Sequence, residues 1–189
     1  MSRKPRIWFP GAAFHITSRG NRRASIFYGD EDRLMYFAYL EETRMHFPFY
    51  LHAYCLMTNH IHLLLETKDH PTAAIMKHMH AKYATYFNRR YELSGHLFQG
   101  RYGGSLIKDD AHFLQVSRYI HLNPVKAGLA RRPHHYPWSS CRALVTSIPD
   151  PHISLTRTLS SFPSPQPFHY QQYIEENIQG GSFHDSINE

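Results

Sequence analysis

The sequence predicts an α+β fold, in which an antiparallel sheet carries helices on one face and a further helix follows the sheet. Runs rich in β-branched and aromatic residues alternate with longer stretches of helical periodicity. Two of the β-rich runs are separated by only three residues, which suits an antiparallel hairpin. The length of 189 residues is that of one ordinary domain with room for an extension.

The first half of the chain predicts a strand, a helix and two more strands. Residues 14–17 form a short strand that leads into a basic loop at 18–23. Asp30 suits the N-cap of a helix that ends near residue 46. Residues 49–57 and 60–66 are the two β-rich runs of the hairpin. The apolar side of the helix is expected to carry Leu34, Phe37, Leu40 and Met45.

The second half predicts a helix, a strand and a third helix. Residues 72–91 have helical periodicity, and residues 97–107 are strand-like but interrupted by glycines. Asp109 and Asp110 open the third helix, where acidic side chains are favourable, and Pro124 follows its expected end. The first six elements therefore have the order of a ferredoxin-like unit. The apolar face of residues 72–91 is expected to carry Ile75, Met79, Tyr83, Tyr86 and Phe87.

The composition of the chain changes near residue 145. Residues 147–167 hold many serines, prolines and threonines, which is typical of a linker. Residues 168–178 could form a short helix, and the residues from 180 onwards are expected to fray. The prediction is a mixed α/β domain at 1–145, followed by a Ser/Pro-rich linker and C-terminal tail at 146–189.

The charge and composition favour a nucleic-acid partner. The net charge is +6, the pI is about 9.4, and the chain holds 13 tyrosines and 12 phenylalanines. Basic residues attract phosphates, and exposed aromatic rings can stack on bases. The two cysteines stand alone, so we expect neither a disulfide framework nor a zinc-thiolate site, and a cytoplasmic location is natural. No apolar run approaches the ~18 residues of a membrane span, and no signal peptide is expected.

His60 and His62 are the first candidate functional residues. On a strand, residues two apart point to the same face, so both imidazoles would converge on one point and form half of a divalent-metal site. With 16 histidines, about one such spacing is expected by chance. A second occurs at His78 and His80, but in a helical segment, where residues two apart diverge by ~200°. Buried structural histidines remain the alternative for the first pair.

Tyr119 and Asn123 are the second candidate pair. They are four residues apart near the end of the third helix and therefore share a helical face. A metal pair on a sheet and a tyrosine on a helix together suggest metal-assisted phosphoryl transfer with Tyr119 as the nucleophile. The alternative is that a helical tyrosine only packs its ring. Other tyrosines that could be proposed as nucleophile are Tyr83, Tyr86, Tyr91 and Tyr102.

Five segments in order carry a family resemblance: residues 15–23, 57–64, 95–102, 119–125 and 138–140. On these motifs the chain resembles the single-tyrosine HUH transposases and, within them, the REP-associated tyrosine transposases. The resemblance covers most of residues 10–145 and none of the tail.

The resemblance implies a ferredoxin-like core, a Mg²⁺ or Mn²⁺ cofactor, and single-stranded DNA as the substrate, here a hairpin (REP-like) repeat. It also implies cleavage through a covalent 5′-phosphotyrosine that leaves a free 3′-OH. By position, His60 and His62 become metal ligands and Tyr119 the nucleophile. Asn123 takes the place of the third ligand, where some relatives carry glutamine.

The implied ligands suit this chemistry because two imidazoles and an amide are neutral. The cation then keeps its full charge for the phosphodiester. The same ligand set would also suit Zn²⁺, Ni²⁺ or Co²⁺, so the choice of Mg²⁺ or Mn²⁺ rests on the resemblance. Candidate DNA-contacting residues lie in the basic loop or beside the catalytic segments: Arg19, Arg22, Arg23, Arg101, Arg118 and Lys126.

Two other functions remain open at this stage. The first is a non-catalytic nucleic-acid-binding protein of the same fold, and the second is a metal-dependent phosphohydrolase that uses water and is indifferent to Tyr119. The protein could work as a monomer or as a homodimer. Residues 138–140 are expected to pack against the core rather than touch DNA.

Overall fold

The computed structural model describes residues 7–146 and 148–176. Four antiparallel strands form one sheet in the order β2-β3-β1-β4. The strands are β1 (Ala13–Arg19), β2 (Phe49–Leu56), β3 (His60–Thr67) and β4 (Gly103–Leu106). The helices are α1 (Asp30–His46), α2 (Thr72–Arg90), α3 (Asp110–Lys126), α4 (Cys141–Val145), α5 (Thr156–Leu159) and α6 (Gln166–Glu175), with short 3-10 turns η1 (Asn21–Arg23) and η2 (Pro133–His135).

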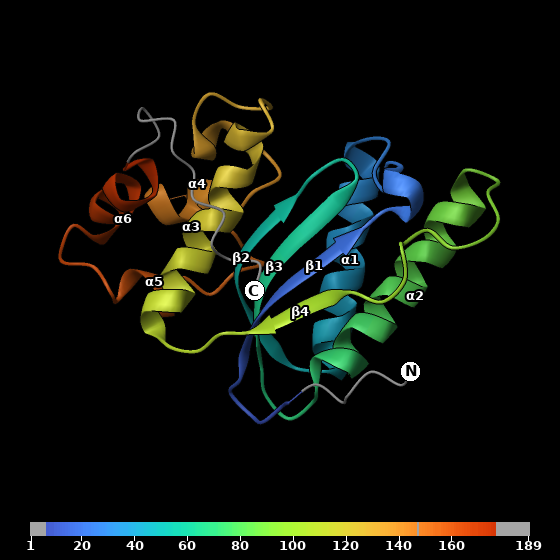
Figure 1. Cartoon of the computed structure of the whole chain (residues 1–189), viewed down its shortest axis with the longest axis horizontal. Helices are drawn as coiled ribbons and strands as arrows, with labels where there is room; N and C mark the ends of the chain where they lie inside the picture. The colour runs from blue at the N-terminus through green and yellow to red at the C-terminus, as the bar shows by residue number, and fades with distance from the viewer. Residues whose placement is uncertain (1–6, 147, 177–189) are drawn as a thin grey trace.

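Figure 1 shows that α1 and α2 lie on one side of the sheet and α3 on the other. The predicted order of the first six elements, the ferredoxin-like sheet and the added third helix are all confirmed. The labelled helices α4, α5 and α6 lie on the side of α3, away from α1 and α2 (Figure 1).

Each strand contributes alternate side chains to two separate cores, because successive residues point to opposite faces. Leu63 and Leu65 of β3 pack with α1 and α2, whereas Leu64 packs with Phe113 and Ile120 of α3. His62 lies two residues before Leu64 and therefore shares its face. The register of the sheet thus directs His62 toward α3.

The buried face of α1 differs from the prediction. Leu34 and Met45 are 59% and 75% exposed, so placing them in the core was wrong. Asp32 and Arg33 are buried instead. Asp32 accepts hydrogen bonds from the backbone N–H groups of residues 28 and 29 and from the hydroxyls of Tyr86 and Tyr91. Because this face is partly polar, the apolar spacing alone misplaced it by about one residue.

The glycine-rich stretch before α3 forms two short pieces rather than one strand. Residues 97–99 pair with the chain just after β1, and β4 begins only at Gly103. A Cβ atom at Gly103 would lie 2.5 Å from Oγ1 of Thr17. The glycine therefore permits the close approach of β4 to β1.

The third helix extends past Pro124 to Lys126, so the expected end before the proline was wrong. Proline has no backbone N–H, so residue 124 cannot donate the helical bond to the carbonyl of Ile120. The chain still closes normally, since the N–H of Ala127 donates to the carbonyl of Asn123 and that of Leu129 to the carbonyl of Pro124.

The described residues after 146 pack against the rest of the chain, although their composition predicts a linker. Tyr170 and Ile174 of α6 are fully buried together with Cys141 and Leu144. Tyr170 and Ile174 share a helical face because they are four residues apart. The division of the chain at 145 and 146 stays a prediction, and residues 177–189 lie outside the described part.

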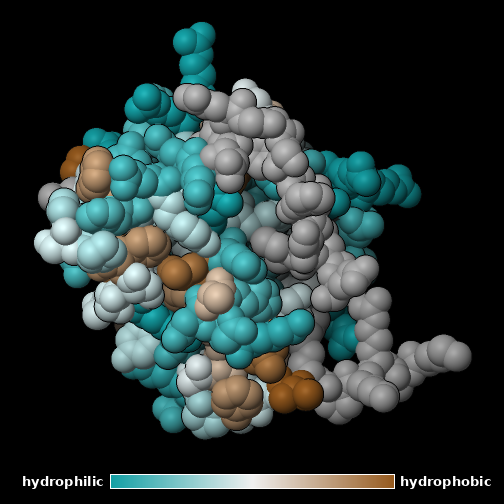
Figure 2. Space-filling model, turned by 60° about the vertical axis from the view of Figure 1, so that its left-hand side comes forward, coloured by the Kyte–Doolittle hydropathy of each residue, from teal (hydrophilic) through white to brown (hydrophobic). Residues whose placement is uncertain are grey.

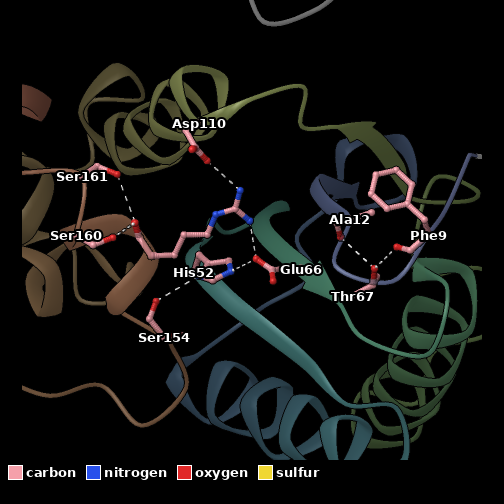
Figure 3. A network of polar contacts seen from close by, with 10 residues as sticks. Phe9, Ala12, His52, Glu66, Thr67, Asp110, Ser154, Ser160 and Ser161 are labelled. Carbon is pink, nitrogen blue, oxygen red and sulfur yellow. Dashed lines mark hydrogen bonds and ion pairs between the residues drawn. The ribbon is translucent and has the colours of Figure 1, made fainter.

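Hydrogen bonds also join the described residues after 146 to the sheet (Figure 3). Arg157 of α5 donates to Glu66 of β3 at 2.6 Å and to Asp110, the first residue of α3, at 3.2 Å. His52 of β2 lies 3.0 Å from the same carboxylate oxygen of Glu66. The guanidinium also lies 4.3 Å from the centre of the Phe113 ring. One arginine therefore joins α5, the sheet and α3.

None of the described helices is long and apolar enough to cross a membrane. On the face that includes α5 and α6, Figure 2 shows hydrophobic residues in small groups among hydrophilic ones.

Candidate active site

A cavity of about 330 Å³ lies where β1, β3 and α3 meet. The register places Thr17 of β1 opposite His62 of β3, and Arg19 opposite His60. Tyr119 reaches the same cavity from α3. The side chains and backbone that line it are His15, Thr17, Ser18, Arg19, His60, His62, Gln99, Gly100, Arg101, Gly103 and Tyr119. The two strand histidines and the helical tyrosine predicted from the sequence are therefore brought together.

The rings in this cavity are close neighbours. The ring centres of His60 and His62 lie 5.1 Å apart, nearly perpendicular. The ring of Tyr119 lies 5.5 Å from that of His62 and edge-on to it. These separations allow a single ion or phosphate group to contact all three side chains.

The hydrogen bonds of His60 leave one ring nitrogen open. The amide nitrogen of Asn59 donates to the carbonyl of Arg23 at 3.1 Å, so its Oδ1 atom faces His60. Nδ1 of His60 lies 2.7 Å from this oxygen, which can only accept. Nδ1 therefore carries the proton, and the lone pair of His60 is on Nε2, which has no hydrogen-bond partner in the described chain.

His15 gives His62 the same kind of support. Nε2 of His15 lies 3.1 Å from Nδ1 of His62, and the two rings are stacked with centres 5.3 Å apart. With the shared proton on Nδ1 of His62, the lone pair on its Nε2 is free. Metal-bound histidines usually have their second nitrogen held in this way. His15 was not predicted from the sequence as a site residue. The available signal was its strand spacing, since His15 and Thr17 are two residues apart and therefore point to the same face of the sheet.

Burial keeps these imidazoles neutral. It lowers the pKa of His15 and of His60 to about 4, with smaller contributions from the charges of His112 and Arg19 respectively. The pKa of His62 is well below its usual range, first because of burial and then because of His15, His60 and Arg19. Neutral imidazoles at neutral pH can donate their lone pairs to a cation.

The donor set fits a divalent cation held by two imidazoles. Within residues 7–146 and 148–176, no three His, Cys, Asp or Glu side chains are placed to hold a metal ion together. Asn123 does not line the cavity, because its Nδ2 atom donates to the carbonyl of Tyr119 at 2.8 Å. A cation with only two protein ligands would complete its shell with water and phosphate oxygens, as Mg²⁺ commonly does.

Tyr119 is the tyrosine that the structure places with the histidines. The alternatives have other roles: the hydroxyl of Tyr83 donates to the carbonyl of Ile26, and those of Tyr86 and Tyr91 donate to Asp32. The hydroxyl of Tyr102 is 2.8 Å from that of Thr72. Burial raises the pKa of Tyr83, Tyr86 and Tyr91, which disfavours their phenolate forms.

Five of the six predicted DNA-contacting cations fall into two groups. Arg19 and Arg101 line the cavity, and the ammonium of Lys126 lies 5.1 Å from the centre of the Tyr119 ring. Arg22 and Arg23 are exposed in the left-handed backbone of η1 and do not line the cavity.

Arg118 belongs to neither group. Its guanidinium donates to the backbone carbonyls of Ile174 and Glu176 at the end of α6 and lies 5.6 Å from the centre of the Tyr173 ring. The structure therefore gives Arg118 a role in holding α6 to α3, and it does not line the cavity.

The face of α3 opposite Tyr119 carries a closed polar network. Nδ1 of His121 is 2.7 Å from the hydroxyl of Tyr170, and its Nε2 is 2.8 Å from the hydroxyl of Ser140. The hydroxyl of Tyr170 is also 2.7 Å from that of Ser117. Ser140 in turn accepts from the backbone N–H of Tyr54 in β2. This network fixes the helix that carries Tyr119.

Residues 138–140 pack as the sequence predicts. The carbonyl of Trp138 accepts from the backbone N–H of Leu56, and Ser139 forms a bridge with Cys55, so the segment extends the edge of β2. The indole of Trp138 donates to Asp30 at 3.1 Å.

The chain matches the family described as "Transposase IS200 like" over residues 9–123. This range contains the whole sheet, His60, His62 and Tyr119. The chain belongs to the IS200-like transposase family. The family resemblance inferred from the motifs is thereby confirmed.

Two known proteins are similar to this transposase. A protein of Haemophilus influenzae named as a REP-associated tyrosine transposase is 30% identical, and the match covers 53% of this chain and 63% of that protein. The chain thus spans less than two thirds of that relative. The structure of a REP-associated tyrosine transposase bound to a REP hairpin has the same fold, with a TM-score of 0.65, 20% identity, and coverage of 82% of this chain and 92% of the other.

Proposed function

We propose that this IS200-like transposase cleaves and rejoins single-stranded DNA through a covalent 5′-phosphotyrosine on Tyr119. In this step the phenolic oxygen forms a new bond to phosphorus, and the bond to the 3′ oxygen breaks. The 3′ oxygen takes up a proton and leaves as a 3′-OH. Because the tyrosyl phosphodiester replaces one ester by another, the same or another 3′-OH can reverse the reaction.

One observation supports this proposal most directly. Two imidazole Nε2 atoms without hydrogen-bond partners in the described chain share a cavity with one tyrosine. A phosphohydrolase that uses water would need the imidazoles but not the tyrosine. A binding protein without catalysis would need neither.

His60 and His62 would hold Mg²⁺ or Mn²⁺. Asn123, whose Nδ2 atom donates to the carbonyl of Tyr119 in this structure, would have to leave that bond and turn its amide oxygen toward the cavity to serve as the proposed third ligand. The cation, when bound, supplies Lewis acidity to the non-bridging phosphate oxygens. His15 orients His62, and Asn59 orients His60. Arg19, Arg101 and Lys126 would add positive charge where the phosphate gains negative charge in the transition state.

The proposed substrate is DNA that contains a hairpin with single-stranded flanks. The net charge of +6 favours a nucleic acid, and Arg22 and Arg23 extend the basic surface beyond the cavity. A related transposase of the same fold is bound to a REP hairpin, which supports extending this substrate class to the present chain. Whether the protein acts as a monomer or a homodimer stays a prediction.

Covalent trapping tests the proposal. The protein is incubated with end-labelled single-stranded hairpin oligonucleotides taken from the flanks of its own gene, with Mn²⁺ or with EDTA, and the products are separated on denaturing gels. We expect a protein–DNA adduct with Mn²⁺ that is absent with EDTA. Tyr119→Phe should abolish the adduct, whereas Tyr86→Phe, a tyrosine outside the cavity, should keep it.

The other outcomes identify the competing functions. Cleavage that persists in Tyr119→Phe would point to a water-using phosphohydrolase. Tight DNA binding with neither adduct nor cleavage in the wild type would favour the non-catalytic binding protein.

A further inference from the structure

A second cavity, of about 610 Å³, lies beside the catalytic one, between α2 and the segment that precedes β4. Its walls include Met76 and Ala84 of α2 and Leu97 and Phe98 of the facing segment. This volume is within the range of small-molecule binding sites. The catalytic roles proposed above make no use of this space.

One wall of the cavity is an aromatic stack with an open polar atom. The rings of His80 and Phe98 are 4.1 Å apart at their centres, with 18° between their planes. Nε2 of His80 is buried and has no hydrogen-bond partner among the described residues. Burial also lowers the pKa of His80 to about 4, so its ring is neutral at neutral pH. A buried polar atom of this kind calls for a partner.

The two cavities are neighbours that share part of their lining. Gly100 and Arg101 line both of them, and the backbone of Gly100 has a φ of +94°, which glycine adopts readily. Arg101 and Lys77 are exposed where they line the second cavity. A ligand that spans both spaces would therefore meet positive charge at the border and a flat apolar wall beyond it.

We propose that this cavity receives one unstacked nucleobase of the DNA strand whose phosphate occupies the catalytic cavity, an inference that rests on the proposed function. A nucleobase offers a flat face for Met76 and the aromatic wall. It also has polar edges that can pair with Nε2 of His80. Its own backbone phosphate would lie near Arg101, which accounts for charge at the border of an otherwise apolar space.

Abasic scanning locates the base. Hairpin oligonucleotides from the flanks of the gene, each lacking one base in a single-stranded flank, are titrated in EDTA with fluorescence anisotropy as the readout. We expect one position near the cleavage site at which loss of the base weakens binding about 10-fold, the usual effect of losing a stacked base. Neighbouring positions should change the affinity much less.

A cavity-filling variant shows whether that base enters this space. Ala81 lines the cavity from an exposed position on α2, so Ala81→Trp should fill it without disturbing the core. We expect Ala81→Trp to weaken binding of intact DNA about 10-fold and to cause no further loss with the sensitive abasic DNA. The matched control is Thr85→Trp, which is exposed on α2 outside the cavity and should bind like the wild type.

A second variant tests the polar atom. His80→Phe retains an aromatic ring against Phe98 but removes Nε2. We expect it to bind intact DNA and to lose preference among the four bases at the sensitive position.

The covalent adduct assay, run on the same variants, separates the two proposals. Normal adduct formation with additive effects of Ala81→Trp and base removal, or with no sensitive position, would overturn the nucleobase site alone. Non-additive effects without any adduct would support the nucleobase site and refute the chemistry at Tyr119. Absence of binding to every oligonucleotide would overturn both.

Discussion

His60 is half-buried and His121 is fully buried, and burial lowers their pKa values to about 4 and about 3. Both ring nitrogens of His121 are bonded, to Tyr170 and to Ser140. In His60 only Nδ1 has a hydrogen-bond partner among the described residues. His60 also lines the cavity, and its Nε2 is not hydrogen-bonded within the described part of the chain. A lowered pKa therefore marks burial in both places. The open nitrogen is what distinguishes a candidate ligand from a structural histidine.

The largest effect should come from His60→Ala. Loss of one of two imidazole donors should reduce Mn²⁺-dependent adduct formation by more than ~100-fold, since even changes to residues that only orient ligands cost about 10–100-fold. Urea denaturation should show little change in stability, because the cavity side of His60 makes no hydrogen bond within the described residues. Normal adduct formation by this variant would show that His60 is not needed as a metal ligand.

His121→Leu should have the opposite profile. The change removes one buried hydrogen bond from the hydroxyl of Tyr170 and one from that of Ser140, which should lower the free energy of unfolding by about 1–3 kcal/mol. Urea denaturation measures this loss. Adduct formation per folded molecule, assayed at low temperature, should stay within a few-fold of the wild type. A urea midpoint equal to that of the wild type would show that the polar network around His121 does not stabilise the fold.

Asn59 determines which nitrogen of His60 can bind a metal, because its Oδ1 atom accepts a hydrogen bond from Nδ1 and leaves the lone pair on Nε2. Asn59→Ala should weaken Mn²⁺ binding about 10–100-fold by releasing the Nδ1 proton from its acceptor. Asn59→Asp keeps an acceptor for His60 and loses only the bond to the carbonyl of Arg23. Calorimetric titration with Mn²⁺ should therefore place the aspartate variant near the wild type. Equal losses in both variants would assign the effect to the loop.

Acid should weaken the fold through the same histidines. In the unfolded chain they take up protons below a pKa of about 6.5, whereas the folded chain keeps His121 neutral to about 3. The unfolded state then binds more protons, so the free energy of unfolding falls as pH decreases from about 6.5 toward 4. The urea midpoint should drop between pH 7.5 and 5.0, and less so in His121→Leu. An identical drop would exclude His121 as a contributor.

The smallest effects should separate Lys126 from Arg118. Lys126→Ala should weaken DNA binding and reduce the slope of log affinity against log salt by about 1, as expected for one lost phosphate contact. Arg118→Ala should leave that slope unchanged and destabilise the chain by about 1 kcal/mol, since its guanidinium holds the end of α6. A smaller salt slope for Arg118→Ala would instead indicate that Arg118 contacts a DNA phosphate.

Much of the site could be predicted because strand and helix periodicity fix the face of a residue. The alternation of His60 and His62 placed both on one face, and the motif at Tyr119 placed this proposed nucleophile on the helix beside them. Periodicity does not give the side-chain rotamer, so it could not show that the amide of Asn123 bonds back to its own helix. His15 lies on a separate strand, and only the sheet register joins it to His62.

The tail was less predictable because composition averages over residues that do different things. Serines and prolines dominate residues 147–167, but a few apolar side chains in α6 bury themselves against α4. The spacing of Tyr170 and Ile174 was the available signal. The second cavity had no signal at all, since it depends on how the segment before β4 lies against α2.

The bond between Tyr170 and His121 has a consequence for synthesis of the protein. The strands and Tyr119 leave the ribosome first, but Ser117 and His121 gain their partner only after about fifty more residues have been translated. A nascent chain stopped near residue 146 would carry every residue of the cavity around Tyr119 and still lack Tyr170 behind α3. A nonsense mutation in this last part of the gene should therefore yield a poorly folded product rather than a shorter working enzyme.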